Sequence, residues 1–120
     1  MGWGGCLQFQ NNGTAVLIGA VAPASCVGNT IGGNLTIQNN TAPGGAVGNT
    51  VGNNLTVQNN TAATIVNGNT VTGNLQDQNN TAPTQVFTNV VGNDLQCQQD
   101  SSITGGGNTA RQKQGQCITF

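Results

Sequence analysis

The sequence predicts an all-β, single-domain β-solenoid, built as a three-sided right-handed parallel β-helix with about 20 residues in each coil. Two observations predict this fold: a strict 20-residue repeat, and an alternation of apolar and polar residues inside each repeat. A third observation is that no segment shows the spacing of an amphipathic helix. We expect one domain over residues 1–120, with an irregular capping coil at 1–26, four repeats at 27–106 and a C-terminal capping coil at 107–120.

Four blocks of 20 residues follow one another without insertion from Val27: VGNTIGGNLTIQNNTAPGGA, VGNTVGNNLTVQNNTAATIV, NGNTVTGNLQDQNNTAPTQV and FTNVVGNDLQCQQDSSITGG. A fixed period of this length is typical of a solenoid, because one repeat cannot bury its apolar face alone. The composition, with 4% charged and 35% hydrophobic residues, would also fit a disordered polar tract. The strict period argues against disorder, and 20 residues do not fit the left-handed hexapeptide coil, which is built from multiples of six.

Each repeat contains one clear strand and a shorter run before it. Residues 35–38 (LTIQ) alternate apolar and polar side chains, and residues 55–58 (LTVQ) repeat the alternation. A period of two indicates a strand with one buried face. The shorter run, residues 27–31 (VGNTI), is followed by a corner at residues 32–34 (GGN). Gly and Asn fit such corners because they tolerate positive φ.

Stacking the coils at about 4.8 Å places equivalent residues in columns. Two apolar columns are expected to point inward: Ile31, Val51, Val71 and Val91, and Leu35, Leu55, Leu75 and Leu95. Three columns consist of asparagine: Asn29, Asn49, Asn69 and Asn89; Asn39, Asn59 and Asn79; and Asn40, Asn60 and Asn80. Because identical amides stacked in register can hydrogen-bond along a column, ladders of this kind would hold together a chain with few apolar residues.

Both ends depart from the repeat. Residues 7–12 (LQFQNN) repeat the strand motif but precede it by 28 residues, which predicts about eight extra residues around Ala15–Ser25. The apolar stretch Ala15–Ala22 resembles a secretory signal, but it lacks a preceding basic segment, and we interpret it as part of the first coil. An export signal of the native protein would then lie upstream. At the other end, residues 105–107 (GGG) are expected to shift the register by one, and Arg111 and Lys113 to protect the last edge.

The cysteines predict disulfides. Cys97 and Cys117 are 20 residues apart, as are Cys6 and Cys26. Stacked positions lie about 4.8 Å apart, inside the Cα separation of roughly 4.4–6.8 Å that a disulfide requires. The alternatives are free thiols or a metal site, but a four-cysteine zinc site is typically built from C-x-x-C pairs, which this chain lacks. Two terminal disulfides favour an oxidising, secreted or cell-surface location.

The composition excludes several functions. Two Lys+Arg give no basic surface for nucleic acid, and no stretch is long enough to span a membrane. The chain has no His and only three acidic residues, so a catalytic triad or a carboxylate pair in a cleft is not expected, nor is a cofactor or a metal site. Asp77 falls in an inward column, where it is either a buried functional acid or, in the interpretation that we favour, rotated so that its carboxylate reaches water.

Six N-x-Ser/Thr sequons begin at Asn12, Asn34, Asn39, Asn54, Asn59 and Asn79. Their regular spacing follows from the repeat itself. Glycosylation is therefore expected only in a host that glycosylates secreted proteins.

The tandem GNTxGGNLTxQNNT blocks at residues 28–41 and 48–61, with the terminal NDLQCQ and KQGQC segments, resemble secreted bacterial proteins with short β-helix repeats and no assigned activity. The resemblance extends over most of the chain from Val27 to Cys117. It implies a parallel β-helix and supplies no catalytic residue.

Two classes of function follow. The first is a non-enzymatic extracellular structural protein that assembles head to tail into a fibre or scaffold, unless the apolar insertion and Phe120 cap the ends. The second is a binding module whose flat Thr/Asn face recognises ice or a polysaccharide. The columns Thr30, Thr50 and Thr70, and Thr41, Thr61 and Thr81, favour ice, although each has only three members. The four aromatic residues do not recur at the coil period, which disfavours a glycan groove.

Overall fold

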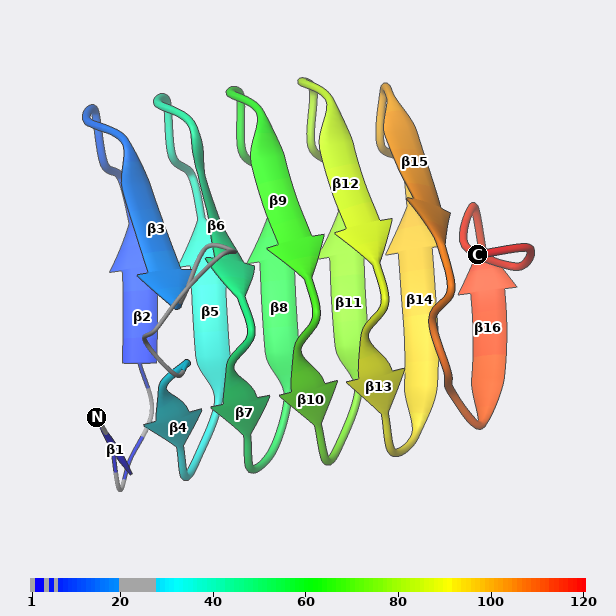
Figure 1. Ribbon diagram of the computed structural model, residues 1–120. Coiled ribbons are helices and arrows are strands. Elements are labelled where there is room, and N and C mark those ends of the chain that lie inside the picture. The colour runs from blue at the N-terminus through cyan, green and yellow to red at the C-terminus, as the bar shows by residue number, and fades with distance from the viewer. Residues whose placement is uncertain (1, 4, 6, 20–27) are drawn as a thin grey trace.

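The computed structural model describes residues 2–3, 5, 7–19 and 28–120. Within these ranges every regular element is a β-strand, and 16 strands form three parallel sheets, one on each side of a coil (Figure 1). Sheet A consists of β1 (Gly2–Trp3), β4 (Thr30–Ile31), β7 (Thr50–Val51), β10 (Thr70–Val71) and β13 (Val90–Val91). Sheet B consists of β2 (Leu7–Gln10), β5 (Leu35–Gln38), β8 (Leu55–Gln58), β11 (Leu75–Gln78), β14 (Asp94–Gln98) and β16 (Gln112–Gly115). Sheet C consists of β3 (Val16–Gly19), β6 (Gly44–Val47), β9 (Thr64–Asn67), β12 (Thr84–Phe87) and β15 (Ile103–Gly106).

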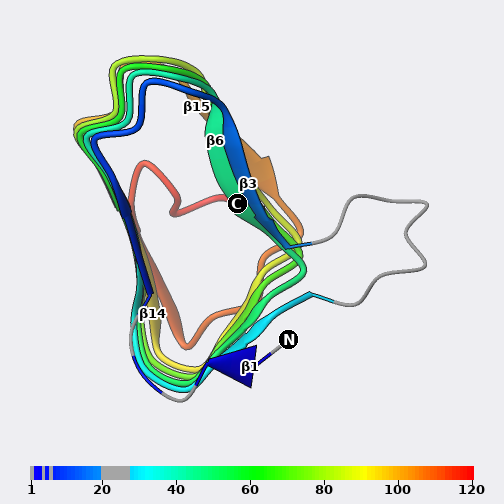
Figure 2. The same cartoon turned by 90° about the vertical axis from the view of Figure 1, so that its left-hand side faces the viewer.

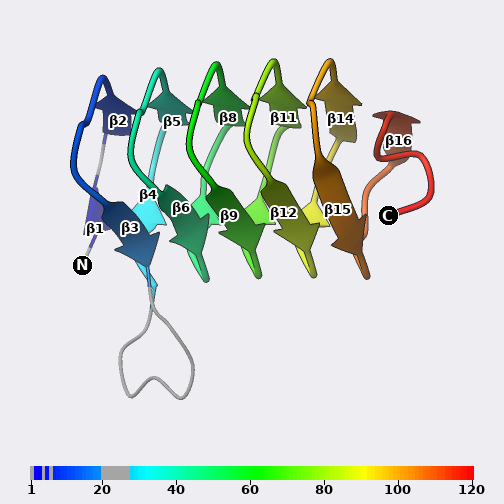
Figure 3. The ribbon, with the colours of Figure 1, turned by 90° about the horizontal axis from the view of Figure 1, so that it is seen from above.

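The coil is right-handed. The chain passes from sheet A through sheet B to sheet C and then enters sheet A of the next coil. Figure 2 looks from the N-terminal end, and there the chain rises along sheet B and descends along sheet C while it recedes from the viewer. A clockwise path that recedes is right-handed. The strands of each sheet stand in a row along the coil axis (Figure 3). The three-sided right-handed parallel β-helix that the sequence predicts is confirmed.

The register in the centre of the solenoid is 20 residues, since Leu35 pairs with Leu55 and Leu55 with Leu75. In the first coil the offset is 28 residues, and it returns to 20 at Asn29. The extra residues therefore fall between Gly19 and Gly28. The sequence placed this insertion too early, because residues 16–19 form β3 in register with β6; the remainder of the expected insertion lies outside the described residues.

A second change of register occurs near the C-terminus. Asp100 still follows Asn80 by 20 residues, but Ile103 pairs with Thr84, 19 residues before it. The turn at Ser101 and Ser102 is thus one residue shorter than its predecessors. The sequence placed this shift at residues 105–107, which is wrong: residues 105 and 106 belong to β15 and are already in the new register.

The interior is filled by columns of aliphatic side chains. Both predicted apolar columns are buried, and they are joined by Ile37, Val57 and Cys97 on sheet B and by Ala46, Val66 and Val86 on sheet C; no member of these columns is more than 4% exposed. Thr64 and Thr84 also point inward, and their hydroxyl groups donate to the carbonyl oxygens of Ala62 and Ala82. The core is narrow, but each column runs through several coils.

The corners of the coil depend on residues that accept positive φ. At the corner between sheets B and C, this position is held by Asn11, Asn39, Asn59, Asn79 and Gln99, with φ between 56° and 58°. At the corner after sheet C, it is held by Gly48, Gly68, Thr88 and Gly107. Asparagine and glycine recur here because they enter the left-handed region at low cost.

We predict that Leu55→Asp unfolds the protein far more readily than Thr56→Asp. Leu55 is fully buried, so an aspartate there would place a carboxylate without a partner in the aliphatic interior, whereas Thr56 is partly exposed on the outer side of the same strand. Thermal denaturation of the two variants measures the difference. Equal losses of melting temperature would contradict the assignment of inner and outer faces.

Candidate functional site

An asparagine ladder follows the corner between sheets C and A through the length of the solenoid. Asn29, Asn49, Asn69, Asn89 and Asn108 belong to it, and the last four are at most 5% exposed. At each step the backbone N–H and the side-chain Nδ2 of one asparagine donate to Oδ1 of the next, as from Asn69 to Asn89 at 2.9 and 3.0 Å. Nδ2 of Asn69 also donates to the carbonyl oxygen of Ala46. Every buried amide group in this column therefore has a partner.

The ladder at this corner was predicted from the 20-residue spacing, except for its last member. Asn108 follows Asn89 by 19 residues, because the turn before β15 is one residue short. A search at a constant spacing therefore misses it, whereas the recurrence of the Gly-Asn pair would have indicated it.

A second ladder follows the corner between sheets B and C. Asn12, Asn40, Asn60 and Asn80 form it and donate in the same direction along the axis. It ends at Asp100, whose Oδ1 accepts the backbone N–H and Nδ2 of Asn80, both at 2.9 Å. The ladder is thus closed by a carboxyl group that accepts as an asparagine would.

The column Asn39, Asn59 and Asn79 has a different role from the one that the sequence suggested. These side chains are exposed, while the neighbouring column Asn40, Asn60 and Asn80 is buried and carries the amide ladder. The physical reason is backbone conformation: Asn39, Asn59 and Asn79 occupy the left-handed turn position, which directs their side chains away from the lumen.

Asp77 is fully buried and stays in register between Val57 and Cys97. The expected rotation of its carboxylate toward water is therefore wrong, because the strand pairing of residues 75–78 holds the side chain in the inward column. Its Oδ1 accepts a hydrogen bond from Nδ2 of Asn80. Burial raises the pKa of the Asp77 carboxyl well above its ordinary value, and the charge of Asp100 raises it further, against the effect of the Asn80 hydrogen bond.

Asp100 lies on the other side of the same amide. Burial raises the pKa of its carboxyl, whereas the hydrogen bonds from Asn80 lower it. Oδ2 of Asp77 and Oδ2 of Asp100 are the two buried side-chain atoms that have no hydrogen-bond partner within the described part of the chain. Two acidic groups and one amide thus form a buried polar cluster inside the solenoid.

The C-terminal end is closed by a short segment, residues 116–120, which we call the C-terminal cap. It turns back across the end of the coil after β16 (Figures 1 and 2). Cys117 is fully buried and forms a disulfide with Cys97, with a Cα–Cα distance of 5.3 Å. Phe120 packs against the core beside Gly105, where a Cβ atom would lie 2.2 Å from the phenyl ring. The cap therefore covers the last coil.

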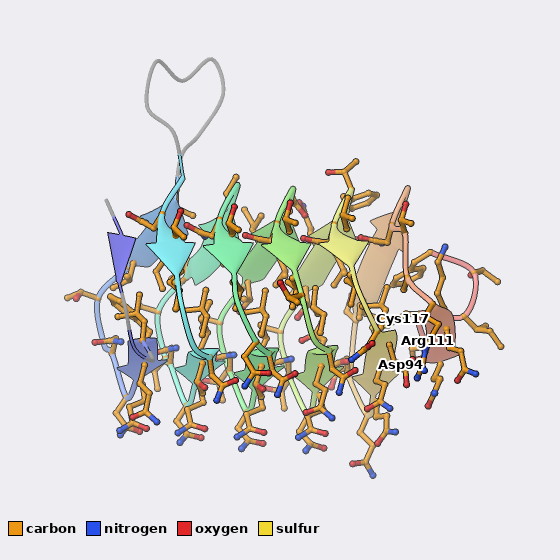
Figure 4. All side chains as sticks on the ribbon, turned by 90° about the horizontal axis from the view of Figure 1, so that it is seen from below. Asp94, Arg111 and Cys117 are labelled. Carbon is orange, nitrogen blue, oxygen red and sulfur yellow. A yellow bond between two sulfur atoms is a disulfide. The ribbon has the colours of Figure 1, made fainter. Side chains whose placement is uncertain are left out.

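The predicted Cys97–Cys117 disulfide is confirmed, although its geometry differs from the simple stacking that predicted it. Gly115, and not Cys117, is the register partner of Cys97, and Cys117 reaches the bond from the turn after β16. Arg111 forms an ion pair with Asp94 near this end, at 3.0 Å (Figure 4). The predicted Cys6–Cys26 bond lies outside the described residues.

The outer surface differs between the three sheets. Sheet A exposes the column Thr30, Thr50, Thr70, Val90 and Thr109. Sheet B presents glutamines that hydrogen-bond along the axis, such as Gln58 to Gln38 at 2.7 Å. Sheet C carries a shallow apolar groove near its N-terminal end, lined in part by Leu17, Gly44 and Ile65. The surface is therefore regular along the axis but chemically different on each side.

Among the described residues, no group of three potential metal-ligating side chains comes together. Over the same part of the chain, no helix has the length and apolar character that crossing a membrane requires. Comparisons of the chain with protein-family models, curated proteins and solved structures found no match.

We predict that Asn69→Ala strongly destabilises the protein, whereas Asn59→Gly has little effect. Alanine at position 69 removes the acceptor of the Asn49 backbone N–H and a donor to the Ala46 carbonyl. Each buried group left without a partner costs about 1–3 kcal/mol. Asn59 is exposed, and glycine accepts its φ of 56°. Chemical denaturation of both variants tests this, and similar stabilities would show that the ladder contributes little.

Proposed function

We propose that this chain is a non-enzymatic structural protein that works outside the cell, of the secreted bacterial short-repeat type that its sequence resembles. The observation that carries the proposal is the continuity of the two amide ladders and the aliphatic columns through successive coils. Such a construction gives a rigid body whose parts cannot move independently. The Cys97–Cys117 disulfide is compatible with an oxidising compartment.

The acidic residues support a role without catalysis. Asp77 and Asp100 are buried away from solvent, and Asp94 is paired with Arg111. Acid–base chemistry on a substrate needs a titratable group that a substrate can reach. None of these three carboxyl groups is free to act in that way.

The two ends of the solenoid support head-to-tail assembly that depends on the C-terminal cap. At the N-terminal end, β1, β2 and β3 are the last strands of their sheets. Edge strands of this kind are templates for pairing with another chain. At the opposite end, the cap covers the core with Cys117 and Phe120. Stacking of one copy on another therefore requires displacement of the cap.

We expect the oxidised protein to sediment as one species of 12.1 kDa, and the double variant Cys117→Ser/Phe120→Ser to associate with increasing concentration. The double variant removes both attachments of the cap and uncovers the final coil. Analytical ultracentrifugation measures the difference. Ile118→Ser is the matched control, because Ile118 is 66% exposed on the same segment. Association of the control, or a double variant that stays monomeric, would contradict the proposal.

A second candidate function is recognition of a repetitive surface, such as ice or a polysaccharide, by sheet A. The exposed threonines Thr30, Thr50 and Thr70 favour it, because in-register pairing of β4, β7 and β10 spaces them regularly along one flat side. Val90, which is 51% exposed, continues the column with an apolar side chain of nearly the same shape.

If sheet A binds a repetitive surface, Thr50→Lys should abolish the binding without unfolding the protein. The substitution places a long charged side chain in the middle of an exposed column, while Val51 beside it remains in the core. Inhibition of ice recrystallisation and retention on insoluble polysaccharides are the two measurements. Gln58→Lys on sheet B is the control, since it adds the same charge to a different side. Equal effects of both variants would exclude sheet A as the binding face.

A further inference from the structure

The buried cluster of Asp77, Asn80 and Asp100 has more acceptors than donors. Nδ2 of Asn80 carries two hydrogens but faces three oxygens: Val57 O, Asp77 Oδ1 and Asp100 Oδ1. In addition, Oδ2 of Asp77 and Oδ2 of Asp100 have no partner. Ionised carboxylates only accept hydrogen bonds, so they add to the excess. A proton on one of the carboxyl groups supplies the missing donor.

The ladder indicates where that donor is needed. Nδ2 of Asn60 donates to Ile37 O at 3.3 Å, and Nδ2 of Asn80 donates to Val57 O, in both cases 23 residues earlier in the chain. An asparagine at position 100 would by the same offset donate to the backbone oxygen of Asp77. Asp100 presents an oxygen instead of an NH₂ group. A protonated Asp100 restores the pattern, because its hydroxyl can donate where the amide would.

The surroundings offer no positive charge to the pair. On β8, which packs against Asp77, residues 55–58 are uncharged, and the acid on β14, Asp94, is engaged by Arg111. Lys113 on β16 lies beside Leu95 and forms no ion pair with either carboxyl group among the described residues. The remaining charge near this end is the terminal carboxylate of Phe120, which is also negative. Two ionised carboxylates here would be uncompensated, at a cost of several kcal/mol for each buried ion.

The cluster is attached directly to the C-terminal cap. The backbone N–H of Asp100 donates to Oε1 of Gln116, and Nε2 of Gln116 donates to the backbone oxygen of Asp100, both at 2.9 Å. Cys97, the register neighbour of Asp77, holds Cys117 of the cap. The carboxyl pair therefore lies where the cap is fastened to the coil.

We propose that Asp77 and Asp100 share a proton inside the solenoid, and that this proton holds the C-terminal cap closed. Because burial raises the pKa of both carboxyl groups, the closed form binds the proton more tightly than an opened form does. The stabilisation is complete below the ordinary aspartate pKa of 3.8 and is lost as the pH rises from there through the raised pKa of the pair. The inference holds whether or not solenoids stack.

The proton itself can be observed by carbon-13 NMR of protein labelled at the aspartate carboxyl carbons. The chain has only three acidic residues, so the spectrum contains three signals and Asp94 serves as the internal reference. We expect the Asp77 and Asp100 signals to titrate as a coupled pair at distinctly higher pH than Asp94, with one proton retained after Asp94 is ionised. Titration of all three signals together would overturn the proposal.

Hydrogen exchange tests the effect on the cap. The amides of Ile118 and Phe120 are hydrogen-bonded within the cap, and their protection factors should fall by up to about tenfold for each pH unit between the two pKa values. Asp100→Asn, which provides a neutral donor at every pH, should abolish this dependence, and Asp94→Asn should preserve it. Asp77→Asn is a second variant that removes one acid of the pair. Protection that does not vary with pH in the wild type, or that varies equally in Asp100→Asn, would overturn the role of the proton.

Discussion

The structure depends on parallel stacking of the coils in register, with backbone hydrogen bonds that run along the axis. One such series passes from Leu35 to Asn54 and from Leu55 to Asn74. Because each coil offers the same side chain at the same place, apolar residues form continuous columns and asparagines form continuous ladders. A buried amide in this setting always finds an identical partner above and below it. The register therefore turns a polar side chain, which is normally costly to bury, into part of the core.

This constraint explains the unusual composition. A chain with 35% hydrophobic residues and 3% aromatic residues could not fill a layered core of the usual thickness. The solenoid needs only three inward sides of small β-branched and leucine side chains, and the corners are filled by amides. The cost is a strict demand on position. A substitution at Asn69 disturbs the coils on both sides, whereas one at Asn59 changes only an exposed corner.

Ends are the weak points of such a stack, and the C-terminal end shows three different attachments. The disulfide at Cys97 is covalent, Phe120 adds apolar contact, and Gln116 joins the cap to the last member of a ladder. That last member is an aspartate in place of an asparagine, next to a second buried aspartate. The place where the repeat stops is thus also where the interior acquires groups that can gain or lose a proton. Rigidity along the rod and control at its end arise from the same column of residues.

The sequence by itself determined the fold class, the period, the inward columns and the pairing of Cys97 with Cys117, because a 20-residue repeat and a period of two both have a direct geometric meaning. Only the tertiary structure decided which of two adjacent asparagines faces inward, since the left-handed conformation of Asn59 and not its residue type turns its side chain to solvent. The structure also decided that Asp77 stays buried and meets Asp100, and that Asn108 extends the ladder after a shortened turn. These features depend on register changes between coils and on contacts across the lumen, which a constant spacing along the chain does not contain.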